Sequence, residues 1–195
     1  WDWEKLSENP NLDMSVVDKN PDKPWNWFKL SANPNLDFSL VVKHHKYWNY
    51  QGLSSRKELT IDIVKDVIMK RNLNDIWDWK ALTIKFSKND KYIRDNPFLL
   101  WRWSYLTSIS NSKYLDFNIV LENPDKPWDW YALSAFDTLD MEIVMKLEHK
   151  VWNWPALSIK IKTKEDSKFI RKQPNKPWKW NVITDYVIKN KDLNL

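Results

Sequence analysis

WDWEKLSENPNLDMSVVDKNPDKP, residues 1–24, is a stretch that returns in altered copies along the rest of the chain. Each copy starts with a tryptophan followed two residues later by a second aromatic, and successive copies start 23 to 29 residues apart. The eight pairs are Trp1/Trp3, Trp25/Trp27, Trp48/Tyr50, Trp77/Trp79, Trp101/Trp103, Trp128/Trp130, Trp152/Trp154 and Trp178/Trp180. All fifteen tryptophans belong to these pairs. Self-similarity at such a period predicts a repeat array.

Two further columns of the repeat are nearly invariant when residues 1–24 are used to number its positions. Position 6 is aliphatic in every copy: Leu6, Leu30, Leu53, Leu82, Leu106, Leu133, Leu157 and Ile183. Position 7 always carries a hydroxyl: Ser7, Ser31, Ser54, Thr83, Thr107, Ser134, Ser158 and Thr184. Positions 3 and 6 share one face of a helical turn, so we expect the tryptophans and the position-6 residues to form the core. We expect the position-7 hydroxyl to bond a backbone group at a helix end.

Each repeat is expected to fold into two short helices. Aspartate is the preferred kind of residue for an N-cap, and the expected N-caps of the second helix are Asp13, Asp37, Asp116 and Asp140. Two divergent repeats are expected to use Asn89 and a Thr163–Asp166 capping box instead. Asparagine tolerates the left-handed conformation that often ends a helix. We expect it to end the second helix in that conformation at Asn20, Asn96 and Asn123.

Helices of this length are marginal in isolation, so neighbouring repeats must hold each other. The predicted fold class is all-α, an α-solenoid of helix-turn-helix repeats of about 24–29 residues. A β-propeller is the alternative that Trp-containing repeats allow, but its blades need ~40–45 residues. We expect one array over residues 1–195, cut at both ends from a longer chain. Its repeats are 1–24, 25–47, 48–76, 77–100, 101–127, 128–151, 152–177 and a truncated 178–195.

The composition argues against an enzyme. Cysteine is absent, which rules out disulfides and thiolate metal sites, and the single glycine, Gly52, rules out a glycine-rich phosphate loop. The three histidines, His44, His45 and His149, have no spacing that suggests a shared metal. A hydroxyl that recurs in every repeat is structural, because catalysis needs such a group once. We therefore expect no catalytic residue, no metal and no cofactor. We also expect no membrane partner, because no apolar run is long enough to span a bilayer.

The string Asn-Pro-Asp-Lys-Pro-Trp-Asp-Trp at residues 123–130, with its close copy at 20–27, resembles Trp-rich tandem repeats in proteins of large DNA viruses. The composition agrees with an AT-rich origin, since lysine outnumbers arginine 26 to 5 and asparagine occurs 19 times. The resemblance carries over no activity and no binding residue. It implies an intracellular location, in the host cytoplasm or in the virion.

The function expected from these features is a non-enzymatic scaffold for an unknown protein partner. Positions 4 and 5 vary most between repeats, and aromatics and arginine are enriched at interface hot spots. The expected binding residues are Phe28, Arg102, Tyr105 and Tyr131.

Two alternatives stay open. Residues 151–195 contain ten Lys and Arg against four Asp and Glu, and Lys179 lies between two tryptophans, so nucleic acid is the second candidate partner. Aspartate occupies the same position in other repeats and would repel phosphate, so we favour core packing over base stacking for the tryptophans. A structural component of a virus particle, built by end-to-end stacking of repeats, is the third candidate function.

Overall fold

The computed structural model describes residues 1–72, 74–109 and 115–189, and only the backbone of 186–189. Within these ranges every element of regular secondary structure is a helix, with no strand, which confirms the all-α prediction. The chain divides into two compact units, Trp1–Arg102 and Trp103–Leu195. The boundary falls inside repeat 5, between the first tryptophan of its pair and the second.

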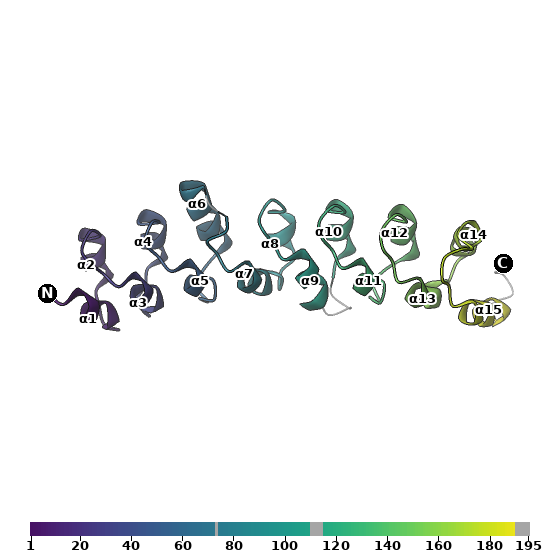
Figure 1. Ribbon diagram of the computed structural model, residues 1–195, viewed down its shortest axis with the longest axis horizontal. Coiled ribbons are helices and arrows are strands. Elements are labelled where there is room, and N and C mark those ends of the chain that lie inside the picture. The colour runs from purple at the N-terminus through teal and green to yellow at the C-terminus, as the bar shows by residue number, and fades with distance from the viewer. Residues whose placement is uncertain (73, 110–114, 190–195) are drawn as a thin grey trace. The chain divides into compact units, whose positions relative to one another are not determined.

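Unit 1 alternates helices between two rows (Figure 1). The helices that follow each tryptophan pair form one row: α1 (Trp3–Glu8), α3 (Trp27–Ala32), α5 (Tyr50–Leu53) and α7 (Trp79–Phe86). The second helices of the repeats form the other row: α2 (Met14–Lys19), α4 (Phe38–Lys43), α6 (Ile61–Arg71) and α8 (Lys91–Arg94). Contacts join neighbours within a row, as α1 with α3, α3 with α5 and α4 with α6.

Unit 2 has the same alternation (Figure 1). Its first helices are α9 (Trp103–Ile109), α11 (Trp130–Leu133), α13 (Trp154–Leu157) and α15 (Trp180–Lys189). Its second helices are α10 (Phe117–Glu122), α12 (Met141–Lys146) and α14 (Lys164–Lys172), and a 3-10 turn, η1 (Ser158–Lys160), follows α13. Again α9 contacts α11 and α12 contacts α14, so counterpart helices of consecutive repeats contact one another at these places.

Most of the expected helix starts are confirmed. The four aspartates proposed as N-caps each accept a backbone N–H with their side chain, and Thr163 and Asp166 form the capping box. Asn89 is the exception: α8 begins after Asp90, and the Asn89 side chain accepts only the Lys91 N–H, 3.2 Å away. The residue between the two aromatics is also a cap, in a role more specific than the sequence indicated. It accepts a first-turn N–H in six repeats, at Asp2, Asn26, Asn49, Asp78, Asp129 and Asn153.

The expected helix ends are wrong in their conformation. Asn20 and Asn123 have φ of −135° and −132°, and Asn72 is the one residue with positive φ in the described chain. The side-chain amide ends the helix instead, because it donates to the carbonyl four residues earlier. These bonds run from Asn20 to Val16 at 3.0 Å, from Asn96 to Tyr92 at 2.8 Å and from Asn123 to Ile119 at 3.0 Å.

The aromatic pairs join consecutive repeats. The second aromatic of one repeat meets the first tryptophan of the next edge to face, with ring centroids 4.8–5.5 Å apart and planes 69–87° apart. This geometry suits the quadrupoles of two rings and adds to their burial. In unit 1 the pairs are Trp3–Trp25, Trp27–Trp48, Tyr50–Trp77 and Trp79–Trp101. In unit 2 they are Trp103–Trp128, Trp130–Trp152 and Trp154–Trp178.

The first tryptophan of each pair after the first repeat is buried. From Trp25 to Trp178 these seven rings are only 2–5% exposed, which confirms their predicted place in the core. Five of them also donate their indole N–H to the carbonyl five residues earlier, at 2.8–2.9 Å: Trp25, Trp101, Trp128, Trp152 and Trp178. The prediction is wrong for Trp1 and Trp180, which are 94% and 44% exposed.

The position-7 hydroxyl links each first helix to the next repeat. Ser134, for example, donates to the Trp130 carbonyl at 2.9 Å and accepts the Asn153 N–H at 2.9 Å. The same two bonds occur at Ser7, Ser31, Ser54, Thr83 and Ser158. In the described chain Thr107 departs from this rule, with a buried hydroxyl that has no partner. The expected bond to a helix-end backbone group is therefore confirmed. A second bond, from the backbone of the next repeat, crosses the contact between the two repeats, which we call the joint.

Candidate interaction surface

The variable positions 4 and 5 lie at the start of each first helix. Position 4 is exposed in every repeat except at Pro155, whereas position 5 is half-buried in five repeats, at Ala81, Tyr105, Ala132, Ala156 and Val182. Phe28 on α3 and Tyr131 on α11, both at position 4, are 65% and 62% exposed. Tyr105, at position 5 of α9, is half-buried and interacts with other groups of the protein. The expected exposure is therefore found for the two position-4 rings and is wrong for Tyr105.

Arg102 and Lys179 occupy position 2, where six other repeats have a capping Asp or Asn. Their backbone N–H groups keep the structural role and donate to Thr83 at 3.1 Å and to Ser158 at 2.9 Å. Their side chains have no acceptor atom and cannot cap a helix, and both residues are exposed. Both cations are thus displayed where other repeats use their side chains for folding.

The five expected binding residues do not form one cluster. In unit 1, Phe28 belongs to repeat 2 and Arg102 to repeat 5. In unit 2, Tyr105 and Tyr131 lie on contacting helices, α9 and α11, whereas Lys179 precedes α15. They occupy three different positions of the repeat: position 2 for Arg102 and Lys179, position 4 for Phe28 and Tyr131, and position 5 for Tyr105.

Lysines near the end of three repeats of unit 2 lie over the second aromatic of the same repeat. Such an ammonium is attracted by the negative face of the ring. The pairs, with their distance from Nζ to ring centroid, are Lys126–Trp103 at 5.4 Å, Lys150–Trp130 at 5.2 Å and Lys176–Trp154 at 4.9 Å. In unit 1, Tyr47 stacks on Trp27 in the corresponding place, with centroids 4.8 Å apart. These second aromatics are therefore covered from one side by their own chain.

A row of inter-repeat hydrogen bonds at position 9 has no counterpart in the sequence expectations. The Asn33 side chain donates to the Asn9 carbonyl at 2.9 Å, Arg56 to the Asn33 carbonyl at 2.8 Å, and Lys160 to the Phe136 carbonyl at 2.6 Å. Lys85 donates to the Arg56 carbonyl in the same way. Burial lowers the pKa of Lys85 and of Lys160. The signal that could have revealed this row is a long or amide donor at one fixed position, but Phe136 interrupts it.

Between repeats 3 and 4 of unit 1 lies an open groove of about 530 Å³. Short and aliphatic side chains, Ser55, Ala81 and Ile84, line it together with the lysines Lys57, Lys85 and Lys88. Its volume is in the range of natural ligand sites. The groove was not predicted from the sequence, because it depends on short side chains of two different repeats lying next to each other.

His44 takes part in a contact between two second helices. His44 at the end of α4 places Nε2 2.8 Å from the Asp18 carboxylate of α2, and Lys43 places Nζ 2.6 Å from the same oxygen. The hydrogen bonds from Lys43 and His44 lower the pKa of Asp18. The carbonyl of His45 accepts the Tyr50 hydroxyl, and burial raises the pKa of Tyr50 to about 12. In the described ranges no three His, Cys, Asp or Glu residues gather as metal ligands.

No protein family, curated protein or solved structure matches this chain. The resemblance to viral Trp-rich repeats therefore stays a prediction. None of the described helices is both long enough and apolar enough to cross a bilayer.

Proposed function

We propose that the chain is a non-enzymatic α-solenoid scaffold that binds other proteins through positions 4 and 5 of its repeats. One observation supports this function above the others. The invariant positions 1, 3 and 7 are used in contacts between repeats, whereas position 4 exposes Phe28 and Tyr131 by 65% and 62%. Large aromatic rings left in water at a variable position are typical of binding anchors.

The test compares partner capture by the full chain and by a Phe28→Ala/Tyr131→Ala variant. The expected result is that proteins cross-linked to the parent chain in cell extract are lost or strongly reduced with the variant. The matched control is Val16→Ala/Met69→Ala, which removes apolar side chains that are 37% and 72% exposed on second helices. Equal loss with both variants, or no loss with either, would contradict the assignment of the surface.

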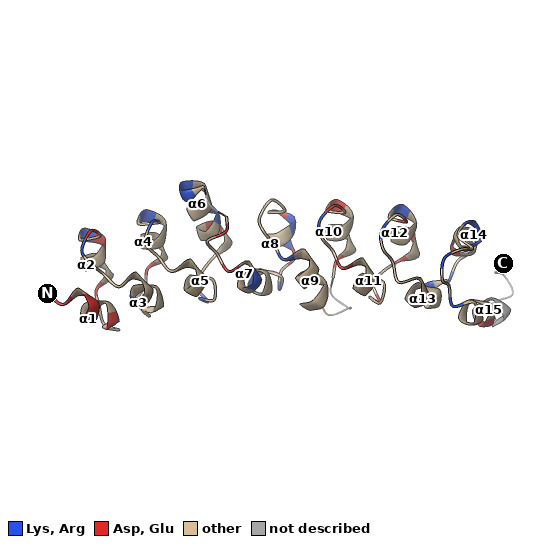
Figure 2. Ribbon diagram, viewed as in Figure 1, with Lys and Arg blue, Asp and Glu red and all other residues tan. Residues whose placement is uncertain are grey.

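Nucleic-acid binding through residues 151–195 is the second candidate, favoured by the basic α14 (Figure 2). Two lysines of residues 151–195, both outside α14, interact within the protein: Lys160 with the Phe136 carbonyl and Lys176 with the Trp154 ring. We therefore propose only weak, non-specific binding, on the order of 10⁻⁴–10⁻⁶ M. Titrating the protein with single-stranded DNA at several salt concentrations measures this affinity and its dependence on salt. Tight binding that survives physiological salt would place this function first.

A further inference from the structure

Short residues line the groove between repeats 3 and 4 at the place where another pair of repeats has an ion pair. Across the joint between repeats 1 and 2, position 8 meets position 5 of the next repeat, where Glu8 and Lys29 form an ion pair at 3.1 Å. The equivalent residues at the groove are Ser55 and Ala81. Neither can reach across, so the space filled by the ion pair in one joint is left as a groove in the other.

The groove combines an apolar wall with positive charge. Ile84 of α7 is 41% exposed, so part of its aliphatic side chain is left in solvent at the groove. Lys57 and Lys88 are exposed at its edges, and the Lys57 side chain is 92% accessible. The residues that line the groove include no carboxylate. Glu58, 4.0 Å from Lys57, is bound by Arg56 at 3.3 Å.

Lys85, the third lysine that lines the groove, is bonded to the backbone of repeat 3. Its Nζ donates to the backbone carbonyls of Arg56 and of Lys57, the latter at 3.1 Å, so the ammonium holds the loop in place. Lys57 and Lys88 are therefore the cations available to a ligand. Two cations beside an aliphatic wall are complementary to an apolar side chain with carboxylates next to it.

We propose that this groove binds an acidic peptide segment of a partner protein, with one aliphatic or aromatic side chain against Ile84 and flanking carboxylates at Lys57 and Lys88. The proposal rests on the protein-binding function proposed above and names the chemistry of the partner at one joint. Single-stranded nucleic acid fits less well, because its binding uses aromatic platforms in a continuous basic groove. The lining contains no aromatic residue.

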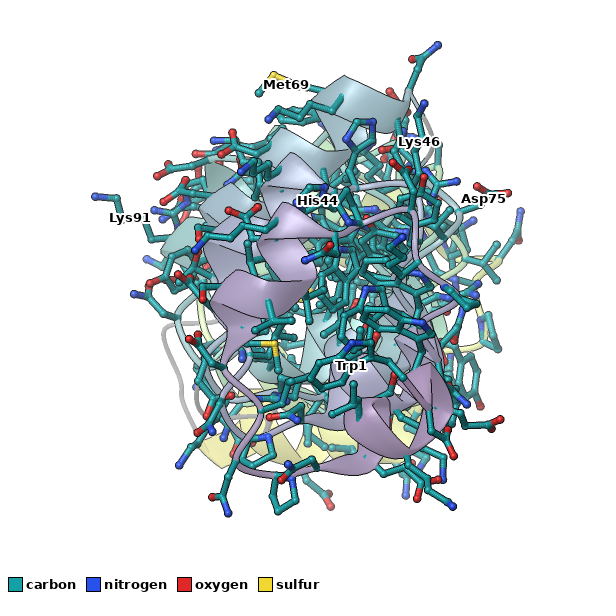
Figure 3. All side chains as sticks on the ribbon, turned by 90° about the vertical axis from the view of Figure 1, so that its left-hand side faces the viewer. Trp1, His44, Lys46, Met69, Asp75 and Lys91 are labelled. Carbon is teal, nitrogen blue, oxygen red and sulfur yellow. The ribbon has the colours of Figure 1, made fainter. Side chains whose placement is uncertain are left out.

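Two variants test the groove without removing any packing contact. Ala81→Tyr fills it, and position 5 already carries a tyrosine, Tyr105, in repeat 5. Its control is Ala156→Tyr at the same position of repeat 7. Lys57→Glu/Lys88→Glu reverses the charge. Its control is Lys46→Glu/Lys91→Glu, the same change at two lysines that extend from opposite sides of the unit (Figure 3). Far-UV circular dichroism and thermal unfolding check that all four variants fold.

The experiment selects a random peptide library on the full chain and measures the affinity of the enriched peptides for each variant. We expect peptides with an apolar residue between acidic ones, which lose roughly tenfold or more in affinity with both groove variants and little with the controls. Enriched peptides that bind the groove variants as well as the parent would overturn the groove and leave the scaffold intact. Failure to enrich any peptide contradicts both proposals. The affinity of each variant for oligothymidine is measured alongside. If the groove variants lose oligothymidine binding and keep peptide binding, the groove is assigned to nucleic acid.

Discussion

Single tryptophans in this protein perform two tasks that the sequence does not separate. Trp25 and Trp48 are both 5% exposed, and each packs edge to face on the second aromatic of the preceding repeat. The indole N–H of Trp25 donates to the Asn20 carbonyl at 2.8 Å. The indole N–H of Trp48 is buried and has no partner among the described residues. The two rings thus share their packing and differ in one hydrogen bond.

Because of this difference, we expect the same substitution to lower the free energy of unfolding by different amounts at the two positions. Phenylalanine keeps an aromatic ring at either position and removes the N–H. Trp25→Phe removes one of two hydrogen bonds to the Asn20 carbonyl, which still accepts the Lys23 N–H at 3.2 Å. Trp48→Phe removes an unsatisfied group. We expect Trp25→Phe to reduce the free energy of unfolding by about 1 kcal/mol more than Trp48→Phe. Denaturant unfolding of the two variants, compared with the parent chain, measures this difference. Equal costs would show that the indole bond contributes nothing to the joint.

At the scale of helices, the joint between repeats depends on one hydroxyl. Ser134 is fully buried and connects the end of α11 to the N-cap residue of α13 through its two hydrogen bonds. Ser134→Ala leaves the Asn153 N–H without an acceptor. We expect a loss of ~1–3 kcal/mol in the free energy of unfolding, the cost of an unsatisfied buried group.

Ser134→Thr is the matched control, because Thr83 makes the same two bonds in repeat 4. We expect this variant to retain most of the stability of the parent chain in the same denaturant titration. If the alanine variant is as stable as the threonine variant, position 7 is conserved between repeats for its size and not for its hydroxyl.

The sequence predicted elements well where a single local interaction decides the structure. The aspartate caps and the Thr163–Asp166 capping box depend on residues a few positions apart, and all were found. The left-handed conformation predicted at the ends of the second helices was wrong, because asparagine has two ways to end a helix. Its side-chain amide can donate back to the helix, and at Asn20 it does so without a left-handed backbone.

The candidate surface was less predictable, because exposure depends on neighbours from other repeats. Phe28 and Tyr131 are free, whereas Tyr105 is half-buried although its position also varies between repeats. The groove is the clearest case. It arises where Ser55 faces Ala81, and neither residue has any property that marks a site on its own. The Glu8–Lys29 ion pair shows that position 8 of one repeat lies beside position 5 of the next, a neighbourhood that only the structure reveals.

For the whole molecule, the proposed solenoid makes a claim about how the two units continue. The same edge-to-face joint is found on both sides of the boundary, at Trp79–Trp101 in unit 1 and Trp103–Trp128 in unit 2. Repeat 5 supplies one aromatic to each, and Arg102 between them bonds Thr83 like the equivalent residue of other repeats. Each unit by itself therefore has the contacts between repeats that the proposed array requires.

Small-angle X-ray scattering of the full chain checks this arrangement. A compact protein of 195 residues has a radius of gyration of about 16 Å. An array in which each repeat contacts only its neighbours is extended, so we expect a radius clearly above that value and an asymmetric distance distribution. The value should not change with protein concentration, which separates an elongated monomer from end-to-end association. A radius near 16 Å would mean that the two units fold onto one another, and the solenoid would have to be abandoned.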